Sequence, residues 1–291
     1  MAFIAPASDH LYFSTDGYRK VQRHYSDMLS AYRVPTTSFY VPTRFGNTFL
    51  TVSGPATAPP VLLVHGLANP SPMWRPNIEA LSQSFQVYAV DVIGDAGRSS
   101  PERPSMLDNS YAMWMIDVLN ELALPQVQLI GMSMGGWVSL STALYHPQRV
   151  SGVFLIAPAG IVTLNTSLIT QAMFALTQWG GRFNVPSLLA KLAYKADGDI
   201  QQLIYLVAQH HRAKPVPPVP ILADNELRSI EVPVHIIAGT EDEMFNTRRM
   251  LQRARLMPGF ATGTLVPGAG HALNATHVHQ VNQAILSFFC R

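Results

Sequence analysis

Short, almost continuously apolar runs alternate with longer segments of helical spacing along most of this chain. The apolar runs are typical of strands buried on both faces, as in a parallel sheet, and they span residues 61–66, 87–91, 127–131, 153–158 and 234–239. Helical segments lie between them, at 73–85, 111–124 and 134–146. This alternation predicts right-handed crossovers and an α/β fold, with a mostly parallel central sheet flanked by helices. Two strand-like runs on either side of 44–47 (RFGN) predict a hairpin at the edge of the sheet.

Composition limits the partners of the chain. Its 291 residues are 48% hydrophobic and 13% charged, which allows a substantial buried core. Lys and Arg number 20 against 18 Asp and Glu, and this formal charge of +2 argues against a nucleic-acid partner or an anionic membrane surface. The densest basic run, 247–255, has the arginine spacing of a solvated helix face. No stretch reaches the roughly 18 consecutive apolar residues of a membrane span.

Cysteine content and the first residues bear on location. The single cysteine, Cys290, allows no disulfide within the chain and fits a reducing compartment. Residues 1–17 lack the cationic start and sustained apolar segment of a secretory signal. We therefore expect a cytoplasmic protein.

The strand pattern is interrupted between 161 and 230, where the sequence is helical and apolar. Prolines then form a stiff connection back to the strand pattern, at Pro215, Pro217, Pro218 and Pro220. We interpret 161–230 as a helical cap over the carboxyl ends of the strands, where ligands bind in such folds, and 1–160 with 231–291 as the core. Extra core helices on a face of the sheet are the alternative interpretation.

The stretch GMSMG, 131–135, sets Ser133 between two glycines where an apolar strand gives way to a helix. It matches the G-x-S-x-G pattern of a nucleophile elbow, in which a sharp strand-to-helix turn exposes the serine hydroxyl. The turn also places the hydroxyl near the N-terminus of the following helix, where negative charge is favoured. The pattern alone is weak, but its position between strand and helix indicates a catalytic Ser133.

A reactive serine needs a base within hydrogen-bond reach. Of the ten histidines, His271 follows a short strand and a glycine-rich loop near the C-terminus, a position from which an imidazole can approach Ser133. The spacing of His277 and His279 is poor for a shared metal ion, and no Cys or carboxylate completes a zinc site beside them. We expect neither a metal nor an organic cofactor.

The base in turn needs a carboxylate that holds its tautomer and stabilises its cation. Glu241, Asp242 and Glu243 follow the apolar strand 234–239, and the residues alone do not separate Asp242 from its neighbours. The order Ser, acid, His along the chain is the order of an α/β-hydrolase.

Acyl transfer also needs backbone N–H groups that bind the developing oxyanion. Met134, the residue after the serine, supplies one candidate. The loop HGLANPSP after the first buried strand supplies the other, since Gly66 permits close approach of the backbone and Leu67 presents its N–H.

Five motifs occur in the order and approximate spacing of the α/β-hydrolase fold family: VHGLA, VDVIGDAGRSS, GMSMGG, GTEDE and GAGH. The resemblance runs from about residue 38 to 289, and within the family the chain looks most like bacterial carboxylesterases of the naproxen-ester-hydrolysing kind. It implies Ser133 as nucleophile, His271 as base, Asp242 as acid, and Leu67 and Met134 as the oxyanion hole. Some relatives carry glutamate as the acid, so Glu243 remains an alternative. The family turn D-x-x-G-x-G-x-S appears here as DVIGDAGRS, with Ala96 at the second glycine, a change expected to shape the loop only.

The resemblance predicts a serine carboxylesterase that hydrolyses esters of apolar alkyl or aryl acids through an acyl-enzyme, with a small-molecule ester as its partner. Two alternatives stay open: a carbon–carbon bond hydrolase of a meta-cleavage dienoic acid, and a ligand-binding member of the fold without catalysis. Cap residues are candidates for the acyl pocket: Met173, Phe174, Leu176, Trp179, Phe183 and Leu188. Neither the physiological substrate nor the oligomeric state follows from the sequence.

Overall fold

An eight-stranded sheet forms the centre of the computed structural model, which describes residues 11–165, 196–211 and 219–290. Its strands lie in the order β1-β2-β4-β3-β5-β6-β7-β8. β1 and β2 pair antiparallel, β2 pairs antiparallel with β4, and all remaining pairs are parallel. The strands are β1 (Thr36–Thr43), β2 (Gly46–Ser53), β3 (Pro60–Val64), β4 (Gln86–Val90), β5 (Val127–Met132), β6 (Val150–Ile156), β7 (Val234–Gly239) and β8 (Phe260–Val266).

The predicted mostly parallel sheet is therefore confirmed, together with the antiparallel hairpin at its edge. Alternate residues of one strand enter two different cores because successive side chains point to opposite faces. In β3, Leu62 and Val64 belong to one core cluster, whereas Val61 and Leu63 belong to the other. Burial on both faces explains why the sequence of these strands is apolar without alternation.

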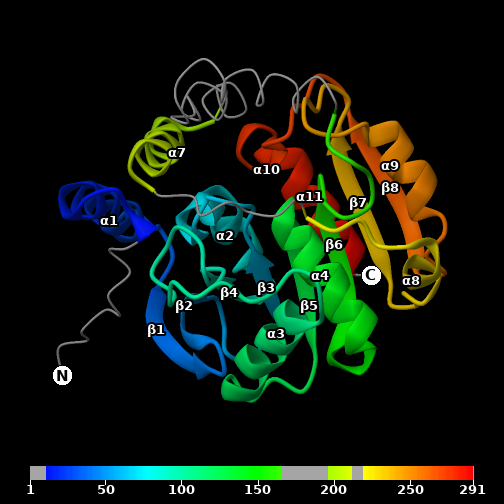
Figure 1. The fold of residues 1–291 in the computed structure, drawn as a ribbon, viewed down its shortest axis with the longest axis horizontal. Helices are drawn as coiled ribbons and strands as arrows, with labels where there is room; N and C mark the ends of the chain where they lie inside the picture. Colours follow the sequence, from blue (N-terminus) through cyan, green and yellow to red (C-terminus); the bar gives the residue numbers. More distant parts are fainter. Residues whose placement is uncertain (1–10, 166–195, 212–218, 291) are drawn as a thin grey trace.

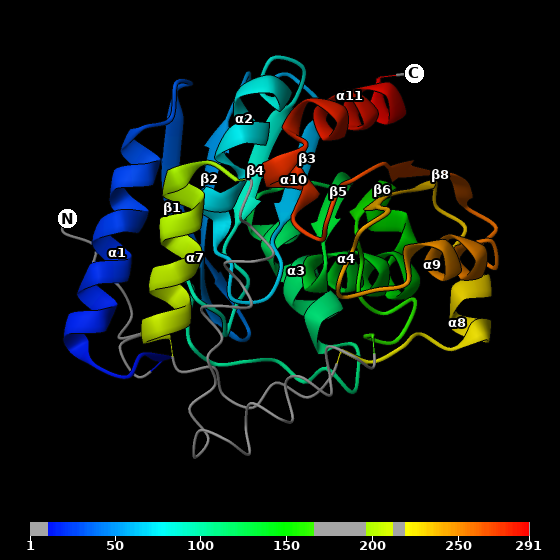
Figure 2. The same cartoon turned by 90° about the horizontal axis from the view of Figure 1, so that it is seen from above.

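Helices cover both faces of the sheet (Figure 2). One face packs against α2 (Arg75–Leu81), α10 (Leu273–Thr276) and α11 (Val278–Phe289), the other against α3 (Ser110–Glu121), α4 (Met134–Tyr145), α8 (Asp224–Arg228) and α9 (Thr247–Ala254). Two short 3-10 helices lie between these elements: η2 (Ser71–Trp74) precedes α2, and η3 (Pro147–Arg149) precedes β6. On α9 the buried residues are Thr247, Met250 and Ala254, so most of its arginines form the solvated face that the sequence predicts.

A pair of helices lies beside the sheet at its β1 side: α1 (Thr15–Ser30) and α7 (Gly198–His210), which run side by side in both views (Figures 1 and 2). Helix α1 is not among the helices expected from the sequence. Two signals mark it, namely the N-cap Ser14, whose hydroxyl accepts the Gly17 N–H, and the buried spacing of Val21, Tyr25 and Met28.

α7 falls within the predicted cap, 161–230, and it is helical as expected. Residues 166–195 and 212–218 lie outside the described part of the chain, so the division into core and cap stays a prediction. Arg75 at the start of α2 ties α7 to the sheet region, since its guanidinium contacts Asp197 and Asp199 at 2.8 Å each. Among the described residues, no helix is long and apolar enough to cross a membrane.

Candidate active site

Ser133 occupies a sharp turn between β5 and α4. Its φ of 50° and ψ of −116° lie in a region that residues with a side chain rarely adopt, at a cost of about 1–3 kcal/mol. Bonds to the end of β6 hold the turn: the Ser133 N–H donates to the Ile156 carbonyl and the Ser133 carbonyl accepts from the Ala159 N–H, both at 3.0 Å. The turn therefore sits at the carboxyl end of the sheet, close to its centre.

The same turn requires glycine at position 135. A Cβ on Gly135 would collide with the carbonyl oxygen of Val64, because the start of α4 lies directly on the end of β3. β3 is also where the strand order reverses, with β4 on one side and β5 on the other, and ligands in open α/β sheets bind at such a point. The elbow is thus formed at the position in the fold where a substrate is expected.

The loop after β3 passes beside Ser133. A Cβ built on Gly66 would lie 3.3 Å from the Ser133 Cβ and 3.9 Å from its Oγ, so the backbone at Gly66 is close to the hydroxyl. Leu67 follows and is 39% exposed, whereas Met134, at the first position of α4, is buried. The first N–H groups of a helix have no acceptor within the helix. The two predicted oxyanion donors, Leu67 and Met134, therefore lie in segments that flank Ser133.

Asp242 and His271 form a buried pair in the loops that follow β7 and β8. The His271 Nδ1 and the Asp242 Oδ2 are 2.9 Å apart, and the two side chains are 6% and 0% exposed. The other carboxylate oxygen, Oδ1, accepts the N–H groups of Met244 at 2.8 Å and Phe245 at 2.9 Å. The Phe245 ring packs against the imidazole, with ring centroids 5.5 Å apart. The carboxylate is thus fixed through one oxygen and holds the imidazole through the other.

The structure separates the three carboxylates that the sequence leaves equivalent. Asp242 is buried and bonded to His271, whereas Glu241 and Glu243 are exposed. Within the described part of the chain, the Ser133 hydroxyl and the His271 ring are not hydrogen-bonded to each other. Catalytic hydrogen bonds often form or shorten only when substrate is bound, so the lack of this bond does not argue against proton transfer between the two residues.

Two side chains near Leu67 received no role from the sequence. His65 is fully buried, and its Nε2 accepts the Val92 N–H at 2.8 Å, which leaves Nδ1 as the donor to the Gly66 carbonyl at 2.8 Å. Asp95 accepts the Ala68 N–H at 2.8 Å. Neither contact is readable from local sequence, because each joins residues 27 positions apart across the β3–β4 pair.

The candidate acyl-pocket residues of the cap lie outside the described residues: Phe174, Trp179, Phe183 and Leu188, together with Met173 and Leu176.

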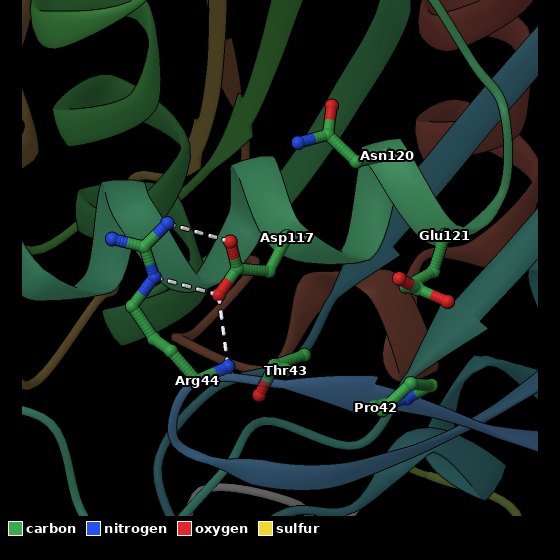
Figure 3. Close-up of a pocket in the computed structure, with 6 residues that line it drawn as sticks. All are labelled: Pro42, Thr43, Arg44, Asp117, Asn120 and Glu121. Atoms are coloured by element: carbon green, nitrogen blue, oxygen red, sulfur yellow. Dashed lines mark hydrogen bonds and ion pairs between the residues drawn. The ribbon is translucent and has the colours of Figure 1, made fainter.

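A separate hollow of about 430 Å³ lies between the β1–β2 hairpin and α3 (Figure 3). Arg44 and Asp117, which form an ion pair at 2.8 Å, line it together, and none of the predicted site residues lines it. Over the described ranges, no group of three or more His, Cys, Asp or Glu is arranged to hold a metal ion.

Comparisons with known proteins agree with the fold and with the geometry of the site. A model of the alpha/beta hydrolase family matches residues 61–284. Carboxylesterase YbfK of Bacillus subtilis (strain 168) is 33% identical over 273 residues, covering 91% of this chain and 92% of the relative. A second relative from that strain, the uncharacterized carboxylesterase nap, is 31% identical over 287 residues, covering 95% and 94%.

Solved structures agree with this relationship. The carboxylesterase CesB (YbfK) and the naproxen esterase (carboxylesterase NP), both from Bacillus subtilis, align with TM-scores of 0.85 and 0.83 at 32% and 28% identity. They cover 95% and 94% of this chain, and 99% of each of those chains is covered. A 2-hydroxy-6-oxo-6-phenylhexa-2,4-dienoate hydrolase from Rhodococcus sp. strain RHA1 aligns with a TM-score of 0.70 over 89% of this chain and 100% of its own, but at 18% identity it shows the fold alone.

Proposed function

Because the chain belongs to the alpha/beta hydrolase family, we propose that it is a serine carboxylesterase acting through an acyl-enzyme on esters of apolar alkyl or aryl carboxylic acids. The observation that carries this proposal is the buried contact between His271 and Asp242 at the same end of the sheet as the strained Ser133 turn. The kinship to two carboxylesterases over more than nine tenths of the chain supports the reaction class.

The proposed reaction begins with proton transfer from the Ser133 hydroxyl to His271 Nε2 while the serine oxygen attacks the ester carbonyl. Asp242, bonded to Nδ1, keeps the accepting nitrogen unprotonated and stabilises the imidazolium that forms. The carbonyl oxygen becomes an oxyanion that the N–H groups of Leu67 and Met134 bind.

The tetrahedral intermediate then collapses and expels the alcohol, which takes the proton from His271. Water attacks the remaining acyl-enzyme, gives its proton to His271 and releases the carboxylic acid, and the proton returns to Ser133. The cycle consumes one water per ester and needs no redox partner.

The substrate class rests on the relatives and on the sequence. The name of one solved relative, naproxen esterase, specifies an ester of an aryl-substituted acid. The apolar cap residues of the sequence analysis, Phe174, Trp179, Phe183 and Leu188, are proposed to contact the acyl group. The dienoate hydrolase aligned above supports the carbon–carbon hydrolase hypothesis only at the level of the fold, and a non-catalytic binder would not need the Asp242–His271 contact.

A fluorophosphonate probe and a substrate panel test the proposal. Wild type is expected to be labelled and to hydrolyse p-nitrophenyl esters, whereas Ser133→Ala loses both properties. Ser139→Ala is the matched control, since this buried serine lies in α4, the helix that follows Ser133, and its hydroxyl donates to the Gly135 carbonyl. Labelling of Ser133→Ala, or turnover of a meta-cleavage dienoic acid in preference to all esters, would show that the proposal is wrong.

A further inference from the structure

We propose that Asp95 is a positioning residue that fixes the loop carrying the oxyanion-binding N–H of Leu67. This inference rests on the proposed function, since it assigns Asp95 a part in the same reaction. Asp95 lies in the turn where Ala96 replaces a family glycine, a change that the sequence predicts to affect the shape of the loop only. The contacts of its carboxylate connect that turn to the reacting centre.

The carboxylate of Asp95 is buried, with 1% of the residue exposed, and each oxygen accepts one backbone N–H. Oδ2 accepts from Ala68 and Oδ1 accepts from Ala96, both at 2.8 Å. Hydrogen bonds from backbone N–H groups to a buried carboxylate are charge-assisted and stronger than bonds between neutral groups. The bond to Ala68 therefore ties the loop after β3 to the loop after β4.

Ala68 needs such a tie because its backbone is strained. Its φ is 57°, in the left-handed region that costs a residue with a Cβ about 1–2 kcal/mol. Without the acceptor at Asp95, the backbone is free to relax to a negative φ. That relaxation rotates the peptide that joins Leu67 to Ala68.

The peptide on the other side of Leu67 is held by His65. Its Nδ1–H donates to the Gly66 carbonyl, and in a trans peptide the N–H of Leu67 points away from that carbonyl. The two peptide planes that meet at the Leu67 Cα are thus each fixed by one buried side chain. His65 sets the direction of the Leu67 N–H, and Asp95 keeps the following peptide from turning it.

Apolar packing holds the loop after β3 on the side opposite Asp95. Ala68 packs against the apolar cluster between α1 and α7, which includes Leu11, Ile200 and Leu203. Ala275, four residues after His271, belongs to the same cluster. The loop is consequently held between Asp95 and this cluster, and loss of the Asp95 acceptor leaves it attached on one side only.

The test is the variant Asp95→Asn. Its side-chain amide has the same shape as the carboxylate, but one of the two oxygens that accept hydrogen bonds becomes an NH₂ group, which can only donate. Asp117→Asn is the matched control, because Asp117 also accepts a backbone N–H, that of Arg44, but lies at the separate hollow of Figure 3. Active-site titration with a fluorophosphonate normalises each rate to folded enzyme. A trifluoromethyl ketone, which forms an oxyanion on Ser133, reports on the loop directly.

Asp95→Asn is expected to lower kcat about 10- to 100-fold per titrated site with little change in KM, as a misplaced catalytic group does. Affinity for the trifluoromethyl ketone falls in parallel, affinity for the product acid does not, and Asp117→Asn changes none of these values. A wild-type kcat in Asp95→Asn, or a loss of ketone and product affinity together, overturns the proposal. Asp95→Ser is measured alongside, and if neither variant folds, Asp95 is a folding residue and the proposal is wrong. An inactive wild type would instead contradict the proposed esterase itself.

Discussion

Asp242 and Asp117 make similar hydrogen bonds in two different regions of the molecule. Each carboxylate accepts three: Asp242 from two backbone N–H groups and the imidazole of His271, and Asp117 from the backbone N–H and two guanidinium nitrogens of Arg44. The side chain of Asp242 is fully buried, whereas that of Asp117 is 14% exposed and that of its partner Arg44 is 49% exposed. His271, the partner of Asp242, is buried at the carboxyl ends of the strands, whereas Arg44 and Asp117 line the hollow between the β1–β2 hairpin and α3 (Figure 3).

The number of hydrogen bonds therefore does not distinguish a candidate catalytic carboxylate from a surface one. Burial does, because exclusion of water strengthens the interaction of a carboxylate with the imidazolium that forms during proton transfer. An ion pair open to solvent is screened and contributes little. The difference between the two regions can be tested by substitutions of graded effect.

The largest effect is expected for Asp242→Asn. The amide keeps an acceptor for Met244 and Phe245 but presents an N–H to the imidazole, which favours the tautomer that cannot take the proton from Ser133. We expect kcat to fall about 10⁴-fold, as in other hydrolases with this arrangement. Ester hydrolysis at saturating substrate measures it. Glu243→Gln is the control, and a large loss in that variant instead would identify Glu243 as the acid.

The strands and the nucleophile elbow were predictable from sequence because their signals are local. Burial on both faces makes each parallel strand a continuous apolar run, and 234–239 matches β7 without change. A turn such as that at Ser133 needs small neighbours, which places glycines at fixed positions. Helix α1 was missed although its N-cap and its amphipathic spacing are present in the sequence, because it lies ahead of the alternation of strands and helices on which the fold prediction was based.

The residues alone predicted neither the choice among the three adjacent carboxylates, for which only the family resemblance indicated Asp242, nor the partners of the loop after β3. Asp242 is distinguished from Glu243 only by the direction in which the loop turns, which depends on packing against Phe245 and His271. The contacts of His65 with Val92 and of Ala68 with Asp95 depend on β3 and β4 being neighbours. Long-range contacts of this kind carry no periodic signal.

A smaller effect on kcat is expected when water gains access to the buried pair of Asp242 and His271. Phe245 is 4% exposed and covers the His271 ring, so Phe245→Leu removes part of that cover and leaves a small cavity. We expect kcat to fall by about tenfold, equivalent to about 1.4 kcal/mol in the barrier, with a stability loss of about 1–2 kcal/mol. Steady-state kinetics and urea unfolding measure the two. An unchanged kcat would show that the hydrogen bonds alone, without the cover, set the strength of the pair.

A buried imidazole whose Nε2 has no partner among the described residues gives a third test. Burial lowers the pKa of His211, an effect that the nearby Asp95 opposes and Arg103 reinforces. As the pH falls below the ordinary value of 6.5, the unfolded chain therefore takes up this proton before the folded chain does, and stability decreases. The glutamine of His211→Gln has no titrating group. The free energy of unfolding of this variant is therefore expected to fall less than that of wild type when the pH is lowered from 7.5 to values below 6.5. If the free energy of unfolding of the two proteins falls by the same amount between these pH values, the pKa of His211 is not lowered in the folded protein.

The smallest effect is expected for Asp117→Asn at the solvent-exposed pair. The amide still accepts the Arg44 backbone N–H, and only the attraction to a half-exposed guanidinium is lost. We expect esterase activity to stay at the wild-type level and Tm to change by no more than about 2 °C, because exposed ion pairs contribute little. Any Tm difference should shrink further in 1 M NaCl, where the Debye length is about 3 Å. A large, salt-independent drop in Tm would mean that this pair is as well shielded as Asp242 and His271, and burial would then no longer explain why the two carboxylates differ.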